Sequence, residues 1–178
     1  MSKIRNDWKL EEVIKLFNMP FNELLFEAHE THINNHKKDM VQVCTLLSIK
    51  TGGCPEDCGY CSQSIHSDDP IEATPLMSLD EVGKKAKIAR DQGSTRFCMG
   101  AAWRRPSNKN IDRVIKMIDV VHNLGMESCV TLGMLSEDQA IRLSKSGLNY
   151  YNHNIDTSRE HYTKVISTRN YQDRLNTL

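Results

Sequence analysis

The chain has 178 residues, of which 39% are hydrophobic and 26% charged, close to the averages of globular proteins and unlike a disordered chain. Its 23 basic and 23 acidic residues balance, and no basic tail or patch occurs, which argues against nucleic acid or anionic lipid as a partner. No apolar stretch approaches the about 18 residues that cross a bilayer and the N-terminus lacks the apolar core of a signal peptide, so we expect a soluble, cytoplasmic protein.

Two helices are expected in the first 36 residues. Apolar residues recur at helical spacing on either side of Pro20, namely Leu10, Val13, Ile14 and Phe17 before it and Leu24, Leu25 and Ala28 after it.

Histidines share one face of the second expected helix, at His29, His32 and His36. Glu30 makes the first of them resemble the start of a zinc-protease H-E-x-x-H motif, but Ile33 stands where the second histidine would fall. We therefore interpret this face as solvated helix surface.

From residue 40 onward, expected strands alternate with expected helices. The strands cover residues 40–49, 95–100, 126–132 and 148–154, and the helices lie between Ser78 and Gly93, over 111–124, between Ser136 and Gly147, and over 171–178. Capping boxes formed by Ser78 with Glu81 and by Ser136 with Gln139 mark the starts of two of these helices.

Alternating strands and helices predict a parallel sheet with right-handed crossovers, either an open doubly wound sheet or a TIM-type barrel. No glycine fingerprint of a dinucleotide or phosphate site follows a strand, and we favour the barrel. A full barrel takes about 250 residues, so four units are half of one. We expect one domain over 1–178, with helices in 1–36 and βα units in 40–178, that is incomplete at its C-terminal end.

Three of the six cysteines stand in one short loop directly after the first expected strand. Cys54, Cys58 and Cys61 have a C-x3-C-x2-C spacing, which suits metal ligands better than disulfides in a reducing compartment. Soft thiolates bind zinc or iron-sulfur clusters, and both usually take four protein ligands. Three thiolates would leave one iron of a cluster open to a small molecule. A structural zinc site with a fourth ligand elsewhere is the alternative.

Two further cysteines fall at nearly matching depth on neighbouring strands. Since side chains alternate along a strand, one face of the second carries Arg96, Cys98 and Gly100 and one face of the third carries Glu127, Cys129 and Thr131. Cys98 and Cys129 could therefore hold a second metal centre inside the barrel, or be two ordinary buried thiols. We expect Cys44, in the middle of the first strand, to be a core residue.

The fourth strand carries polar residues toward the rim where such barrels place their active sites, namely Tyr150, Asn152, Asn154 and Asp156. Asn154 and Asp156 would suit a ligand site, but either could instead cap a following helix.

Three sequence blocks, Leu46–Cys58, Gly93–Trp103 and Tyr150–Thr157, resemble the radical S-adenosylmethionine superfamily and, within it, the family of biotin synthases. The similarity extends from Trp8 to Leu178. It implies that the three-cysteine loop holds a [4Fe-4S] cluster whose open iron binds S-adenosylmethionine.

The resemblance also implies roles for single residues. Tyr60 would lie near the adenine, and Gly100, Ala101, Ala102 and Trp103 would contact the methionine part of S-adenosylmethionine. Asn154 and Asp156 match residues at the ribose and the substrate dethiobiotin, with Asn154 on the substrate side and no acid–base side chain needed. Arg174 matches a residue near the cofactor's carboxylate, although by itself it would be interpreted as a surface arginine.

The activity implied is the last step of biotin biosynthesis. One electron, from a donor such as flavodoxin or ferredoxin, would cleave S-adenosylmethionine and produce a 5'-deoxyadenosyl radical that removes hydrogen from dethiobiotin. Sulfur would come from a [2Fe-2S] cluster with Cys98 and Cys129 among its ligands and Arg96 beside it. A homodimer is the family's expected assembly.

The family completes its [2Fe-2S] ligands with a third cysteine and an arginine that are expected beyond Leu178, so we expect a fragment that lacks an intact second cluster and leaves its last strand as an unpaired edge. Lipoyl synthases also insert sulfur but use a cysteine-rich motif upstream of the first cluster, where this chain has only Cys44. A non-catalytic iron-sulfur or zinc-binding module is the alternative from another class.

Overall fold

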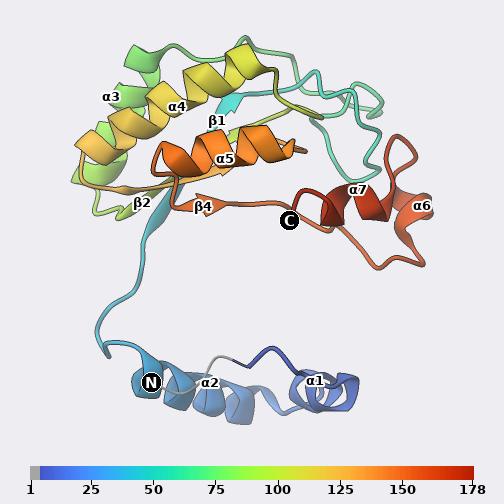
Figure 1. The fold of residues 1–178 in the computed structure, drawn as a ribbon. Coiled ribbons are helices and arrows are strands. Elements are labelled where there is room, and N and C mark those ends of the chain that lie inside the picture. The colour runs from blue at the N-terminus through green and yellow to red at the C-terminus, as the bar shows by residue number, and fades with distance from the viewer. Residues whose placement is uncertain (1–4) are drawn as a thin grey trace. The chain divides into compact units, whose positions relative to one another are not determined.

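The structure is a computed structural model that describes residues 5–178. The chain divides into two compact units, one that ends at Val41 and one that runs from Gln42 to Leu178 (Figure 1).

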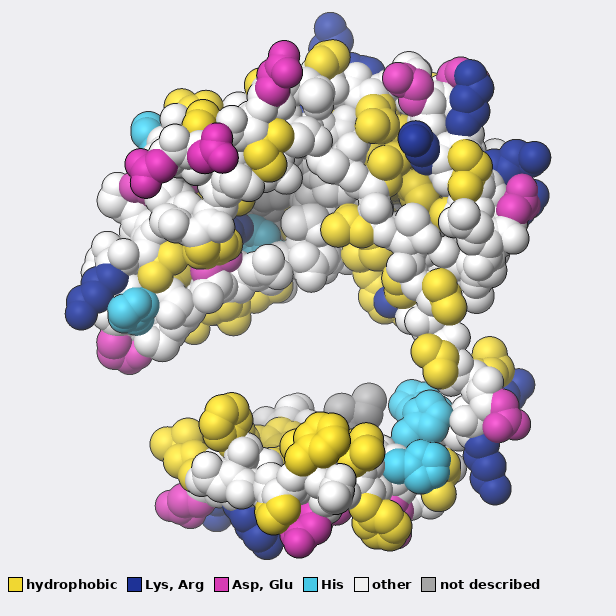
Figure 2. Space-filling view, turned by 180° about the vertical axis from the view of Figure 1, so that it is seen from behind, with side chains coloured by type: hydrophobic (Ala, Val, Ile, Leu, Met, Phe, Trp, Pro, Cys, Tyr) yellow, Lys and Arg dark blue, Asp and Glu magenta, His cyan; other side chains and the backbone are white. Residues whose placement is uncertain are grey.

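The N-terminal unit contains the two predicted helices, α1 (Leu10–Phe17) and α2 (Phe21–Asn35). Neither helix has a buried residue, and Phe17 and Phe21 are among the most exposed apolar side chains. Figure 2 shows hydrophobic side chains on the surface of the protein. At the C-terminal end of α2, the ring of His32 stacks on that of the capping residue His36, with their centroids 5.5 Å apart. The helical prediction is confirmed, and the unit has no apolar core of its own among its described residues.

The second unit is built on a parallel sheet of four strands in the order β1-β2-β3-β4. The strands are β1 (Cys44–Lys50), β2 (Arg96–Ala101), β3 (Glu127–Thr131) and β4 (Tyr150–Tyr151). The parallel prediction is confirmed, and the sheet has the βαβ order of a TIM-type barrel.

Two strand boundaries were predicted wrongly. The first strand begins at Cys44 instead of residue 40, because its partner β2 begins at Arg96, directly opposite Cys44. The fourth strand has two residues instead of seven. Its ladder ends at Tyr151, with one more backbone bond from Asn152 N to Val130 O at 2.9 Å, because β3 ends one residue further on.

Helices α3 (Leu79–Asp91), α4 (Asn108–Asn123) and α5 (Glu137–Lys145) follow the first three strands. Both predicted capping boxes form, and α4 starts three residues earlier than expected because Ser107 accepts a hydrogen bond from Asn110 N. Two short helices close the chain. The first, α6 (Tyr162–Val165), was not predicted, and the second is the predicted α7 (Tyr171–Leu175). Over residues 5–178, no helix is both long and apolar enough to cross a membrane.

The core lies between one face of the sheet and helices α3, α4 and α5 (Figure 1). Ile49, Phe97 and Val130 point from three strands into this core and are fully buried. Strand side chains alternate, so Cys44 lies on the opposite face and is exposed. The prediction of Cys44 as a core residue was therefore wrong.

A glycine turn carries the chain from β1 into the cysteine loop. Gly52 has a φ of +65°, and a Cβ atom there would lie 2.5 Å from the backbone oxygen of Ile71 and 2.7 Å from that of Glu72. Lys50 fixes the turn, since its ammonium group donates to the backbone oxygens of Gly52 and Ala102. Only glycine meets both the conformation and the close approach.

Replacing Gly52 tests this packing. Gly52→Ala should lower the free energy of unfolding by about 3 kcal/mol, the sum of a left-handed backbone penalty and a steric overlap. Gly93→Ala is the matched control, because Gly93 has a φ of +93° with nothing within 4 Å of its missing Cβ. That control should cost only about 1 kcal/mol in urea unfolding. Equal losses for the two variants would contradict the role of close packing.

Candidate functional site

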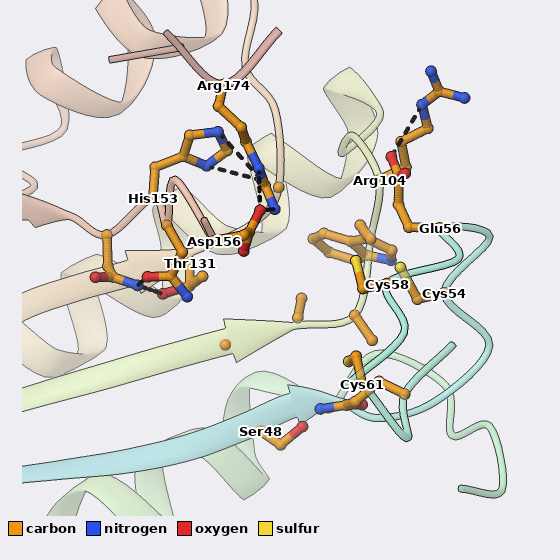
Figure 3. A pocket seen from close by; sticks show the side chains of 18 of the residues that line it. Ser48, Cys54, Glu56, Cys58, Cys61, Arg104, Thr131, His153, Asp156 and Arg174 are labelled. Carbon is orange, nitrogen blue, oxygen red and sulfur yellow. Dashed lines mark hydrogen bonds and ion pairs between the residues drawn. The ribbon is translucent and has the colours of Figure 1, made fainter. Parts of the chain in front are cut away.

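A pocket of about 390 Å³ opens at the C-terminal ends of the strands, a volume in the range of small-molecule sites. Figure 3 shows the loop cysteines on one side of it and His153, Asp156 and Arg174 across from them. The predicted residues that line this pocket are Cys54, Cys58, Tyr60, Cys61, Gly100, Ala101, Ala102, Trp103, Asn154, Asp156 and Arg174.

Backbone hydrogen bonds fold the cysteine loop back on itself. Cys54 N donates to Gln63 O at 2.9 Å, and Cys61 N donates to Cys58 O at 3.0 Å. All three thiols are partly buried. Burial raises the pKa of Cys54 and of Cys58, although the hydrogen bond from Arg169 opposes the rise at Cys58.

Asp57, between the first two cysteines, fastens the loop to residues 167 and 168. Its carboxylate accepts hydrogen bonds from the backbone N–H groups of Ser167 and Thr168 at 3.0 to 3.1 Å and from both hydroxyls. The hydrogen bond from the Ser167 hydroxyl is the largest cause that lowers the pKa of Asp57. A backbone hydrogen bond from Gly59 N to Val165 O, at 3.0 Å, also joins the loop to this part of the chain. The loop is therefore held by a segment more than a hundred residues away in the sequence.

Arg169 lines the pocket beside the loop, with only 2% of its side chain exposed. Its guanidinium group forms an ion pair with Glu56 at 2.9 Å and with Asp156 at 3.1 Å, and it donates to Cys58 Sγ at 3.2 Å. Its Nε donates to the Tyr162 hydroxyl at 3.1 Å. One buried cation thus contacts the cysteine loop and the segment after β4 together.

Asp156 is the acidic centre of the pocket, with 1% of its side chain exposed. It accepts from Tyr60 at 2.5 Å and pairs with Arg174 at 2.9 Å, in addition to Arg169. Burial alone would raise the pKa of Asp156, but the Tyr60 hydrogen bond and the two arginines lower it. Its φ of 76° is the only positive value among the described residues other than glycine, which fits a site where contacts hold a strained backbone.

The polar residues after β4 do not cap a helix. Asn154 Oδ1 accepts from Asn152 at 3.4 Å, and Asn152 also donates to the Thr131 hydroxyl at 3.2 Å. Arg174 is 12% exposed, so it is not a surface arginine. The capping interpretation of Asn154 and Asp156 and the surface interpretation of Arg174 are both wrong.

The second pair of thiols lies on the face of the sheet that also carries Gly100 and Thr131, outside the lining of this pocket. Cys98 and Cys129 are direct partners in the ladder between β2 and β3, which confirms the predicted matching depth. Burial, followed by the hydrogen bond with Cys129, raises the pKa of Cys98 to about 12. Arg96, on the same face, pairs with Glu127 at 2.8 Å and stacks on the ring of Tyr150.

Sequence reasoning missed Glu56, Arg169 and His153. Glu56 stands inside the cysteine motif and is 3% exposed, so its place between two predicted ligands was the available signal. Arg169 and His153 have no local pattern, because their partners come from other parts of the chain.

The family model described as "Radical SAM superfamily" matches residues 48–178. The chain belongs to this superfamily. Membership implies a [4Fe-4S] cluster and S-adenosylmethionine as cofactors, and three thiols on one loop are a donor set that suits such a cluster.

Relatives named biotin synthase match the whole chain. One from Ruthia magnifica subsp. Calyptogena magnifica is 58% identical over 178 residues, and one from Vesicomyosocius okutanii subsp. Calyptogena okutanii is 57% identical. The match covers all of this chain and 55% of each relative. The chain therefore spans about half the length of the curated relatives it matches.

Among solved structures, methylornithine synthase (PylB) superposes with a TM-score of 0.75 over 96% of this chain and 52% of that one. At 16% sequence identity, this likeness supports the fold alone.

The protonation of His153 gives a test of the pocket's electrostatics. Burial and the nearby charge of Arg174 lower the pKa of His153 from 6.5 to about 4. As the pH falls, His153 takes up a proton in the unfolded chain at a higher pH than in the folded protein. The folded state should therefore lose stability as the pH falls from about 6.5 toward 4. An NMR titration should show a neutral ring at pH 6.

Arg174→Met should move the pKa of His153 upward, because it removes the neighbouring charge. An unsubstituted protein whose His153 titrates at 6.5 would contradict the pocket geometry.

Proposed function

We propose that this chain carries the radical-generating site of a biotin synthase, which converts dethiobiotin to biotin. The main support for this proposal is that the three loop thiols and the polar groups after β4 line one pocket. The 58% identity to a protein named biotin synthase supports the choice of reaction within the superfamily.

Cys54, Cys58 and Cys61 would hold the [4Fe-4S] cluster. Among the described residues, no three His, Cys, Asp or Glu side chains gather closely enough to share a single metal ion. Three thiolates on one loop favour a cluster with one open iron over the zinc site that was the alternative, because structural zinc usually takes four protein ligands. When bound, the cluster would supply the electron that cleaves S-adenosylmethionine into methionine and a 5'-deoxyadenosyl radical, which takes hydrogen from dethiobiotin.

The remaining pocket residues would bind and orient S-adenosylmethionine. The buried carboxylate of Asp156 is ionised and suits the hydroxyls of a ribose, and Tyr60 offers an aromatic face to the adenine. The strand-end turn from Gly100 to Trp103 would contact the methionine part, and Arg174 would face its carboxylate. Asn154 would lie toward dethiobiotin. Such fixed groups align the reacting atoms and exclude water.

Cys98 and Cys129 would be two ligands of a [2Fe-2S] cluster that donates sulfur, with Arg96 beside it. Their direct pairing in the ladder and their burial, partial at Cys98 and nearly complete at Cys129, support this proposal. Electrons would come from a flavodoxin or ferredoxin, and we propose a homodimer as the assembly. Residues 1–178 would belong to a single catalytic barrel domain, with its βα units in 40–178.

Anaerobic reconstitution with iron and sulfide tests the first cluster. We expect about four irons at the loop, a loss of this cluster in Cys58→Ala, and its retention in Cys44→Ala, the matched control for an exposed thiol outside the loop. Adding S-adenosylmethionine should change the electron paramagnetic resonance spectrum of the reduced cluster. Zinc at the loop, or a cluster indifferent to S-adenosylmethionine, would contradict the proposal.

The substrate is tested with the same reconstituted protein and a chemical reductant. Dethiobiotin should stimulate the formation of 5'-deoxyadenosine from S-adenosylmethionine. Formation that dethiobiotin leaves unchanged would contradict the proposed substrate while leaving the radical chemistry intact.

A further inference from the structure

We propose that Arg169 is a positioning residue that raises the reduction potential of the loop's cluster through its hydrogen bond to the Cys58 sulfur. The inference rests on the proposed function, since it requires a [4Fe-4S] cluster on Cys54, Cys58 and Cys61.

The first support is the contact itself. Arg169 Nη2 lies 3.2 Å from Cys58 Sγ, and the same nitrogen lies 3.1 Å from Asp156 Oδ2. A ligand sulfur keeps lone pairs that can accept hydrogen bonds after it binds iron, so this contact can persist in the loaded protein. Hydrogen bonds to the sulfurs are among the factors that set the potential of an iron-sulfur cluster.

The second support is that the guanidinium group cannot turn away. Its Nη1 is 2.9 Å from Glu56, its Nε donates to the Tyr162 hydroxyl at 3.1 Å, and only 2% of the side chain is exposed. Four partners on a planar fork fix the direction of each N–H group. A lysine could keep the charge but has no such fork.

The third support is the local charge. Three guanidinium groups, those of Arg104, Arg169 and Arg174, pair with two carboxylates, those of Glu56 and Asp156. Arg104 is 48% exposed, so solvent screens its charge, and among the buried members of the network Arg169 is the cation that touches a thiol. Adding an electron to the cluster adds negative charge, so a buried cation at its ligand stabilises the reduced form more than the oxidised form.

The two roles open to Arg169 predict different results. An arginine that only braces the loop would affect folding and cluster uptake but leave the potential of a bound cluster unchanged. A direct hydrogen bond to the ligand sulfur makes the potential itself depend on this side chain.

The experiment is a redox titration, followed by electron paramagnetic resonance, of the anaerobically reconstituted protein without S-adenosylmethionine. Arg169→Gln should make the midpoint potential of the cluster more negative by about 59 mV. For one electron, that shift is a decrease of about tenfold in the equilibrium constant for reduction. Arg169→Lys should shift it in the same direction by less, because the charge remains. Arg142→Gln is the matched control, since it removes an arginine that pairs with Asp112 outside the pocket.

The Lys variant keeps the inference falsifiable if Arg169→Gln does not fold. Potentials equal to that of the unsubstituted protein would overturn the inference, as would two Arg169 variants that fold but take up no cluster while Arg142→Gln does. An unsubstituted protein that binds no cluster would instead overturn the proposed function on which the inference depends.

Discussion

The buried guanidinium group of Arg169 is the point on which the site depends. Taking such a charge out of water is costly unless every N–H group finds a partner, and its partners come from three separate segments. Glu56 and Cys58 belong to the cysteine loop, Asp156 follows β4, and Tyr162 lies in α6. The network closes only when all three segments are in place, so it orders the thiols and the polar wall of the pocket together.

The strand ends, the turn at Gly52 and the register of β2 and β3 each place a different part of the site. Parallel strands end at the same edge and bring the loop after β1, the turn after β2 and the segment after β4 around one pocket. The glycine at position 52 then allows the turn after β1 to pack closely against the backbone of residues 71 and 72. Deeper on the same face, the register of β2 and β3 sets Cys98 directly beside Cys129. The radical site and the second thiol pair are thus consequences of one sheet.

Much of this arrangement could be predicted from the sequence, because it depends on local signals. Capping boxes placed two helix starts correctly, and the alternation of strand residues placed Cys98 and Cys129 opposite each other. The same alternation should have shown that Cys44 lies on the face opposite the fully buried Ile49. The error came from judging Cys44 by residue type rather than by strand face.

The ion-pair network could not be predicted in this way. Arg169 contacts Cys58 across 111 residues of sequence, and no periodicity or cap signals such a pair. The short β4 had a similar cause, since the length of its ladder is set by where β3 ends.

The claim that one buried network positions both halves of the site is tested most directly by a double-mutant cycle. The free energy of unfolding would be measured for the unsubstituted protein, Asp156→Asn, Arg169→Gln and the double variant. We predict a coupling of about 2 kcal/mol between the two positions, because each single change removes one partner of the buried charge that remains at the other position. Additive losses, within about 0.5 kcal/mol, would contradict the account.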